Sequence, residues 1–314
     1  MQQATTSTVG RDMFRFYSIM FRDHLEAANA APRTIETYGL AVDQLGEYLR
    51  TQGMPTNPTD VTREHLIEWM RYLQRPAAEG GREVSAATAN QRYRSISRFF
   101  KFLLEQEEIT QNPLAKMTPP KVPEKLVPVV KTVDLSRVLK SLAGTDFEAR
   151  RDRAIFSLFI DTGLRVSEMA GLTLADLDLE DREIEVIQGK GRKSRRLRFA
   201  RETRTDIQRY LLRRGEHPHA EDEALWIGKR GAVTKSGMYR LVIRRCEQAD
   251  IGHVYPHMLR HTFAHMYRLN GGSDDDLMRV AGWKSREMLS RYGASVAEAR
   301  AAEAHDAHSP RRGL

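Results

Sequence analysis

Two arginines and a histidine in the second half of the chain have the residue types that bind a phosphate and stabilise it under nucleophilic attack. Arg165 lies in the segment DTGLRVSE, and Arg260 follows His257 by one helical turn in the segment HMLRH, so the last two side chains can share a face. A guanidinium group can hold two phosphate oxygens and stays charged at all accessible pH values. Pro256 suits the first turn of that helix, whose N-terminal amides also favour an anion. These residues predict a cationic pocket for a phosphodiester.

Three further residues can supply the nucleophile and the remaining contacts. Lys190 is expected on the turn of a β-hairpin, where a lysine can protonate a departing sugar oxygen as a general acid, and Lys193 is the nearby alternative. Tyr292 has a hydroxyl with an unperturbed pKa of about 10, so it needs the cationic pocket to become a nucleophile. The indole of Trp283 can donate a hydrogen bond but cannot transfer a proton, so we expect it only to position the phosphate.

The order and the neighbours of these residues resemble the active site of the tyrosine recombinase (phage integrase) family. The resemblance covers roughly Thr34 to Gly293 and is strongest in the catalytic segments, although many family members have histidine in place of Trp283. It favours Lys190 over Lys193 as the catalytic lysine. The catalytic residues that it implies are Arg165, Lys190, His257, Arg260, Trp283 and Tyr292.

The resemblance implies a site-specific DNA recombinase that cleaves and rejoins strands. Tyr292 would attack a DNA phosphate and form a 3′-phosphotyrosine, and two successive strand exchanges would pass through a four-way junction. Protomers would bind double-stranded DNA at inverted half-sites and assemble into a tetramer, with an accessory directionality factor as a further partner. One phosphodiester replaces another and the site works by positioning and charge, so neither a cofactor nor a metal is expected.

Two alternative functions stay open. A type IB-like topoisomerase uses the same tyrosine chemistry but acts alone, and the segments around Arg165 and Arg260 fit a recombinase better. A DNA-binding regulator with a degenerate active site is a different class of protein. All the catalytic positions are filled here, whereas a regulator of that kind should have lost at least one of them.

Four histidines have a spacing that could bind a metal ion. His257, His261 and His265 recur every four residues, with His253 ahead of them. No acidic residue lies within that run, and Arg260 would place a cation in the site. We therefore expect no metal, and we predict that His261 supports the active site structurally.

Other charged clusters have structural interpretations beside functional ones. Glu168 follows Arg165 by three residues and can orient it through an ion pair, or can be a surface acid of a helix. The segment 274–276 consists of three aspartates and is better interpreted as the acidic first turn of a helix capped by Ser273 than as a metal cluster. The basic run 192–196 can be only a solvated charge run, which is the usual meaning of such a patch.

Composition agrees with a DNA-binding protein but does not establish one. The 314 residues suffice for about two domains, and 50 Lys and Arg against 42 Asp and Glu leave a formal charge of +8, which favours a polyanionic partner. The single cysteine, Cys246, excludes an internal disulfide framework. No apolar run reaches membrane-spanning length. We expect a cytoplasmic protein of a bacterial or phage-infected cell, associated with the nucleoid.

The elements that must position these residues are mainly α-helices. Residues 11–115 read as a bundle of about four helices with apolar stripes at helical spacing, and Ser85 can cap the fourth. The stripe of that fourth helix leaves a basic flank that can face phosphates. The predicted DNA contacts, of which Arg92 is the best by resemblance, are Thr34, Arg92, Arg94, Lys101 and Lys121.

A proline-rich segment separates this bundle from the catalytic part. Because proline at this density favours extended backbone, we place a linker at residues 116–130. A catalytic domain of mixed α/β structure follows over 131–293, with helices and a hairpin between Ile184 and Phe199. The fold class predicted is therefore mainly α with a small β-hairpin, arranged as a two-domain DNA clamp. A flexible N-terminus, 1–10, and an Ala-rich tail, 294–314, flank the domains, and tail docking on a neighbouring subunit is a hypothesis for control of Tyr292.

Overall fold

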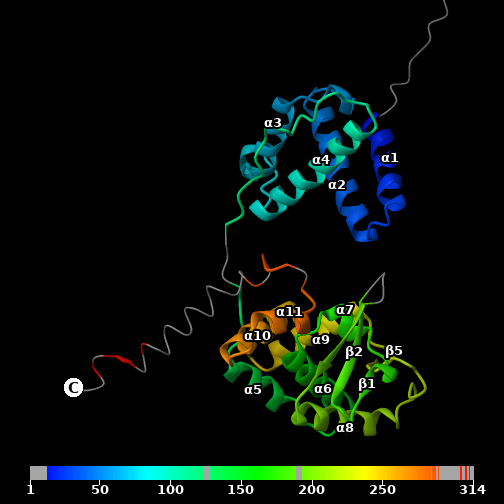
Figure 1. The fold of residues 1–314 in the computed structure, drawn as a ribbon, viewed down its shortest axis with the longest axis vertical. Helices are drawn as coiled ribbons and strands as arrows, with labels where there is room; N and C mark the ends of the chain where they lie inside the picture. Colours follow the sequence, from blue (N-terminus) through cyan, green and yellow to red (C-terminus); the bar gives the residue numbers. More distant parts are fainter. Residues whose placement is uncertain are drawn as a thin grey trace, which may run out of the picture. The chain divides into compact units, whose positions relative to one another are not determined.

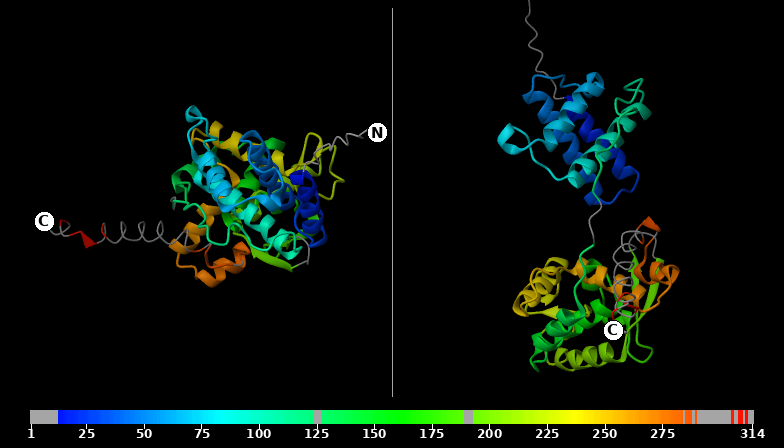
Figure 2. Two further views of the ribbon diagram at one scale, coloured as in Figure 1. Left: turned by 90° about the horizontal axis from the view of Figure 1, so that it is seen from above. Right: turned by 90° about the vertical axis from the view of Figure 1, so that its left-hand side faces the viewer.

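The computed structural model describes residues 13–123, 127–188, 193–283, 285–287, 289, 305, 308, 309 and 311. Within these residues the chain is mostly helical with two small sheets, which confirms the predicted mainly α fold with a small hairpin. It divides between Glu124 and Lys125 into two compact units, shown in Figure 1 and from two further sides in Figure 2. Among the described residues, no helix has the length and apolar character needed to cross a membrane.

The first unit is a helical bundle whose apolar stripes form its core. The predicted stripes are buried: that of the first helix consists of Phe14, Tyr17, Phe21 and Leu25, and that of the fourth of Ala89, Tyr93, Ile96, Phe100 and Leu103. Ser85 caps the last helix, because its hydroxyl accepts a 3.2 Å hydrogen bond from the backbone N–H of Thr88. The helices of this unit are α1 (Met13–Ala27), α2 (Pro32–Thr51), α3 (Arg63–Gln74) and α4 (Ala86–Glu105), with short 3-10 helices at Pro58–Asp60 and Ala77–Glu79.

Both ends of the predicted linker are anchored by hydrogen bonds. On the first unit, the Tyr93 hydroxyl donates to the carbonyl of Met117 at 2.6 Å, and the Asn90 amide donates to the carbonyl of Pro120 at 2.8 Å. On the second unit, the buried backbone N–H of Val130 donates to the Thr262 hydroxyl at 2.8 Å. Met117 and Pro120 are therefore held on the first unit, and Val130 is a packed part of the second.

The second unit combines helices with a three-stranded antiparallel sheet of order β1-β2-β3. Its hairpin has the predicted place, and Val186 pairs with Arg195 across it. The strands are β1 (Leu177–Asp178), β2 (Glu183–Gln188), β3 (Lys193–Arg198) and a separate pair, β4 (Ile227–Gly228) and β5 (Gly231–Ala232). The helices are α5 (Thr132–Ser141), α6 (Phe147–Thr162), α7 (Val166–Ala170), α8 (Arg201–Arg214), α9 (Lys235–Gln248), α10 (Pro256–Leu269) and α11 (Asp274–Ala281), with a 3-10 helix at Leu174–Asp176.

Helix α6 is the centre of this unit. It packs against α8 and α10, and it is buried over most of its surface. Its fully buried Asp152 accepts charged hydrogen bonds from Arg151 and, at 2.7 Å, from Arg245 of α9. This paired carboxylate is well satisfied, as a buried charge must be. A rigid α6 fixes the turn at its C-terminus, where the candidate active site begins.

Candidate active site

The turn after α6 requires glycine for two reasons. Gly163 ends the helix in the left-handed region at φ +57, which glycine adopts without steric cost. A β-carbon at this position would lie 2.3 Å from the Phe263 ring of α10. Gly163 therefore brings the end of α6 into close contact with α10 and directs the chain to Arg165.

Arg165 precedes the first residue of α7 and is held by a carboxylate from the same turn. Its backbone N–H donates to Glu168 at 2.9 Å, and its guanidinium donates to the other oxygen of that carboxylate at 2.7 Å. The guanidinium also donates to the carbonyl of Gly282 at 3.1 Å. Of the two interpretations of Glu168, the structure favours the orienting ion pair.

Arg260 comes from α10, which begins at Pro256 as the sequence predicts. Its side chain is only 2% exposed, and its guanidinium donates to the carbonyls of Gly163 at 2.7 Å and Ala281 at 2.6 Å. The guanidinium carbon lies 5.5 Å from the centre of the Trp283 ring, which is a cation–π distance. Arg260 is therefore fixed on both sides within the packed protein.

Three consecutive carbonyls at the C-terminus of α11 accept hydrogen bonds from three arginines. Arg195 donates to Val280 at 2.9 Å, Arg260 donates to Ala281, and Arg165 donates to Gly282. The last carbonyls of a helix have no partner within it and carry the negative end of its dipole, so guanidinium groups stabilise them. Figure 1 shows α7, α10 and α11 on the same side of the second unit, away from α8. The helix end thus gathers the two predicted arginines beside Trp283.

Arg195 is a site residue that our sequence reasoning missed. It donates to both oxygens of Glu168, at 3.1 and 2.8 Å, and its side chain is only 12% exposed. The interpretation of 192–196 as a solvated charge run is therefore wrong at this residue. Strand alternation could have found it, because Arg195, Leu197 and Phe199 point to the same face while Arg196 and Arg198 are exposed.

Glu168 is held in its charged form. Burial raises its pKa, but the hydrogen bonds from Arg195 and from the backbone of Arg165, with the charge of Arg195 and the guanidinium of Arg165, outweigh burial and lower the pKa to about 2. The carboxylate is therefore ionised at neutral pH. It can hold two guanidinium groups in place together.

The two histidines of α10 lie next to each other. The ring centres of His257 and His261 are 4.2 Å apart in an edge-on arrangement, with His257 exposed near the start of the helix and His261 buried. Within the described part of the chain, no three His, Cys, Asp or Glu side chains are grouped so that they could hold a metal ion. Ser273 caps α11 as predicted, accepting from the backbone N–H of Asp276 at 3.1 Å.

Two of the six predicted catalytic residues, Lys190 and Tyr292, lie outside the described residues. The structure brings Arg165, Arg260 and Trp283 together, and it places His257 one turn before Arg260 on the same helix. The roles of all six residues stay predictions.

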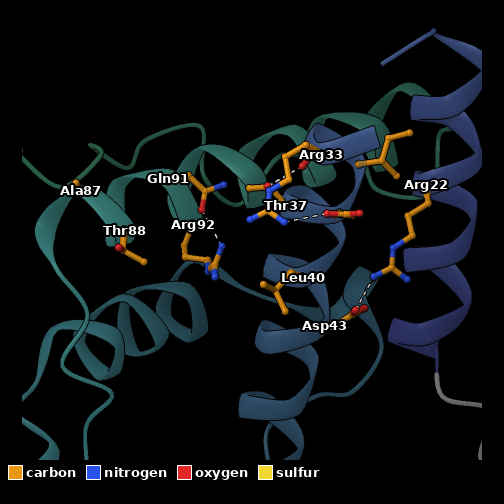
Figure 3. Close-up of a pocket in the computed structure, with 11 residues that line it drawn as sticks. Arg22, Arg33, Thr37, Leu40, Asp43, Ala87, Thr88, Gln91 and Arg92 are labelled. Atoms are coloured by element: carbon orange, nitrogen blue, oxygen red, sulfur yellow. Dashed lines mark hydrogen bonds and ion pairs between the residues drawn. The ribbon is translucent and has the colours of Figure 1, made fainter. Parts of the chain in front are cut away.

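The first unit has a groove between the N-terminal halves of α2 and α4, with a volume of about 850 Å³ (Figure 3). Arg92 lines this groove, and its guanidinium donates to the side-chain oxygen of Gln91 at 2.7 Å. The other two arginines in the lining are paired with acids, Arg22 with Asp43 and Arg33 with a glutamate of the same helical turn. Arg92, by contrast, donates its hydrogen bond in the groove to the neutral amide of Gln91.

The other predicted DNA contacts do not line the groove. Thr34 lies in the first turn of α2, and Lys121 is exposed beyond the last anchored residue of the first unit. Arg94 and Lys101 are exposed on α4. Arg94 follows Gln91 by three residues, so it continues the same face of the helix beyond the groove.

Comparison with known proteins identifies the family. Residues 131–299 match the phage integrase family, and residues 20–110 match the N-terminal SAM-like domain of phage integrases. The tyrosine recombinase XerC of Corynebacterium efficiens is 34% identical over 217 residues, which are 68% of this chain and 68% of that protein. The chain belongs to the phage integrase family.

Solved structures share the fold. The XerH site-specific recombinase, bound to a palindromic difH substrate in a post-cleavage complex, superposes with a TM-score of 0.71 at 20% identity, covering 95% of this chain and 90% of that one. A lambda integrase tetramer bound to a Holliday junction gives 0.66 at 17% identity, covering 88% and 76%. The predicted enzyme class, a tyrosine site-specific DNA recombinase, is confirmed by the family match and by the relatives.

Proposed function

We propose that this recombinase cleaves one DNA strand at a time by attack of Tyr292 on a phosphodiester held between Arg165 and Arg260. The observation that carries this proposal is a pair of hydrogen bonds. Through them the guanidinium groups of Arg260 and Arg165 reach the adjacent carbonyls of Ala281 and Gly282 at the C-terminus of α11, and Arg260 lies beside Trp283. A guanidinium carries five N–H donors, so it can bond to protein acceptors and to phosphate oxygens at the same time. Fixed cations at the scissile phosphate stabilise the charge that develops during attack.

In the proposed step, the bond from the Tyr292 oxygen to phosphorus forms while the bond from phosphorus to the 5′-oxygen breaks. His257 helps to accept the proton of the tyrosine hydroxyl, and Lys190 supplies a proton to the leaving 5′-oxygen. The product is a 3′-phosphotyrosine and a free 5′-hydroxyl. Attack by a 5′-hydroxyl of the partner duplex reverses the step and restores the phosphodiester, so no external energy source is consumed.

The proposed assembly is a tetramer of protomers bound to two duplexes at inverted half-sites. Two rounds of strand exchange would create and then resolve a four-way junction. The support is the shared fold with a lambda integrase that forms a tetramer on a Holliday junction. We place the activity on DNA in the cytoplasm of a bacterial or phage-infected cell, and the support is that the similar tyrosine recombinases are bacterial proteins.

We propose that the groove of the first unit faces DNA through Arg92. Burial, followed by the charge of nearby Arg82, lowers the pKa of Arg92, so a phosphate or base acceptor close to it would stabilise the guanidinium. The exposed cations Arg94 and Lys101 lie on the same helix, α4, outside the groove. Contacts of this kind supply affinity through the phosphate backbone and, in a groove of DNA, can also read bases.

A covalent-adduct experiment tests the proposal. The target site is first selected from a pool of randomised duplexes by binding to the full-length protein. A nick is then placed near the cleavage position of the selected duplex, so that the covalent adduct is trapped. Wild type should form a covalent protein–DNA product, and Tyr292→Phe should bind the same duplex without forming one. An adduct with the Phe variant would show that another residue is the nucleophile.

A further inference from the structure

We propose that Arg195 is a positioning residue for strand cleavage, acting through Glu168 on the catalytic Arg165. This inference rests on the proposed function, because it concerns the geometry of that same site. Arg195 lies on β3, five residues after Lys190 in the sequence, and it reaches two other elements of the site at once. We assign it no contact with DNA.

The guanidinium of Arg195 makes three hydrogen bonds. Two of them go to the two oxygens of Glu168 and form a fork, and the third runs from its Nε to the carbonyl of Val280, at 2.9 Å. Forked bonds between guanidinium and carboxylate fix the angle between the two planes as well as the distance. Arg195 therefore locks Glu168 in rotation and ties β3 to the end of α11.

The locked carboxylate in turn defines the position of Arg165. Glu168 accepts from both the backbone and the guanidinium of Arg165, so a rotation of the carboxylate would move or release that guanidinium. The side chain of Glu168 is only 9% exposed, and water has little access to replace a lost partner. Removal of Arg195 leaves Glu168 with Arg165 as its remaining described charged partner, without the fork that sets its orientation.

The position of Arg165 matters most in the transition state. A misplacement of about 1 Å in a catalytic group can slow a reaction roughly 100-fold. Binding of DNA depends on many phosphate contacts, so it should respond much less to the same displacement. Loss of Arg195 should therefore lower the cleavage rate much more than the affinity for DNA. A general loss of structure would lower both.

The first test compares Arg195→Ala with the matched control Arg198→Ala. Arg198 lies on the same strand, but its side chain is exposed and pairs with Glu183 at the surface. With saturating full-length protein on the nicked duplex, Arg195→Ala should slow single-turnover cleavage about 100-fold and change the DNA Kd less than about 3-fold. The control should cleave at the wild-type rate. Equal losses in rate and affinity, or a loss as large in the control, would overturn the proposal.

The second test asks whether Arg195 acts through Glu168. We expect Glu168→Gln to slow cleavage as well, and the double variant Glu168→Gln with Arg195→Ala to be within about 3-fold of the slower single variant, because both changes break one chain of contacts. Losses that multiply in the double variant would show that Arg195 acts independently of Glu168, and the proposal would be wrong.

A lysine variant separates charge from geometry. Arg195→Lys keeps a cation beside Glu168 but cannot form the fork and reach Val280 at once. It should melt close to wild type and still cleave about 10-fold more slowly, intermediate between wild type and the alanine variant. Full activity in the lysine variant would show that charge alone suffices and would overturn the positioning role. If wild type itself forms no adduct, the proposed function fails instead, and that outcome is distinct from a normal rate in Arg195→Ala.

Discussion

The guanidinium of Arg260 donates a 2.7 Å hydrogen bond to the carbonyl oxygen of Gly163, a residue that lies 97 positions earlier in the chain. The bond joins the C-terminal turn of α6 to the helix that carries His257. It depends on the close approach that glycine permits, since a β-carbon there would collide with Phe263. The glycine before the first predicted arginine thus also positions the second one.

Gly163→Ala should damage cleavage more than it damages folding. The left-handed backbone costs an alanine about 1–2 kcal/mol, and the contact with Phe263 adds to this, so the melting temperature should fall. The end of α6 must also shift away from α10, which lengthens the bond to Arg260. We expect a cleavage rate at least about 10-fold lower at a temperature where the variant is fully folded. A folded variant with the wild-type rate would contradict the role of this bond.

Arg165→Ala and Arg260→Ala should each lose cleavage while retaining much of the DNA affinity. Removal of one donor to a developing negative charge costs on the order of 100- to 1000-fold in rate. The many other phosphate contacts remain, so the Kd should change far less. Single-turnover adduct formation and a binding titration on the same duplex measure the two effects. Equal loss of both would argue against a role in the transition state.

The stabilising effect of Glu168 should depend on pH. Its pKa lies near 2 in the folded protein against 4.5 in the unfolded chain, which corresponds to roughly 3 kcal/mol of stability above pH 4.5. That contribution is lost as the pH falls from about 4.5 towards 2, because the unfolded chain takes up the proton first. Urea unfolding of wild type and Glu168→Gln between pH 3 and 7 should show a difference that shrinks with acid. A constant difference would contradict the low pKa.

Arg92→Ala should weaken DNA binding and its dependence on salt. If Arg92 contacts a phosphate, its loss should reduce the slope of log affinity against log salt concentration by about 0.9. Arg71→Ala is the matched control, because Arg71 is an exposed arginine of the same unit that pairs with Glu68 outside the groove. An unchanged slope in the Arg92 variant, or an equal change in the control, would exclude this contact.

Cys246 should be unreactive in the folded protein. Burial, followed by the charge of Glu247, raises the pKa of its thiol to about 12, so the thiolate that reacts with alkylating reagents is scarce at pH 8. A thiol-specific reagent should label the chain only after unfolding by urea. Rapid labelling under native conditions would contradict the burial of this side chain.

Much of the fold could be predicted because its signals are local. The apolar stripes of α1 and α4, the Ser85 cap and Pro256 at the start of α10 are all features of neighbouring residues, and each lies where the sequence predicts it. The pattern around Arg165 and Arg260 likewise depends on short spacings. Periodicity and capping are properties of a segment, so they do not require knowledge of the fold.

The contacts that complete the site could not be predicted in the same way. Main-chain carbonyls at the C-terminus of α11 accept one bond from each of Arg165, Arg260 and Arg195, and any residue type supplies the same oxygen. Nothing in the amino-acid sequence of that helix identifies these carbonyls as acceptors. The partnership of Arg195 with Glu168 joins residues 27 positions apart and depends on how β3 meets α7. The pairing of Arg22 with Asp43 in the groove similarly follows from the packing of α1 on α2.

Because the acceptors at the end of α11 belong to the backbone, no exchange of one side chain for another can delete them. The direction in which these carbonyls point, however, depends on the number of residues in the helix. One inserted residue turns everything after it by about 100°, which would carry the carbonyls of 280, 281 and 282 away from their donors together. Substitutions at the exposed positions of this helix should therefore be tolerated better than any change in its length.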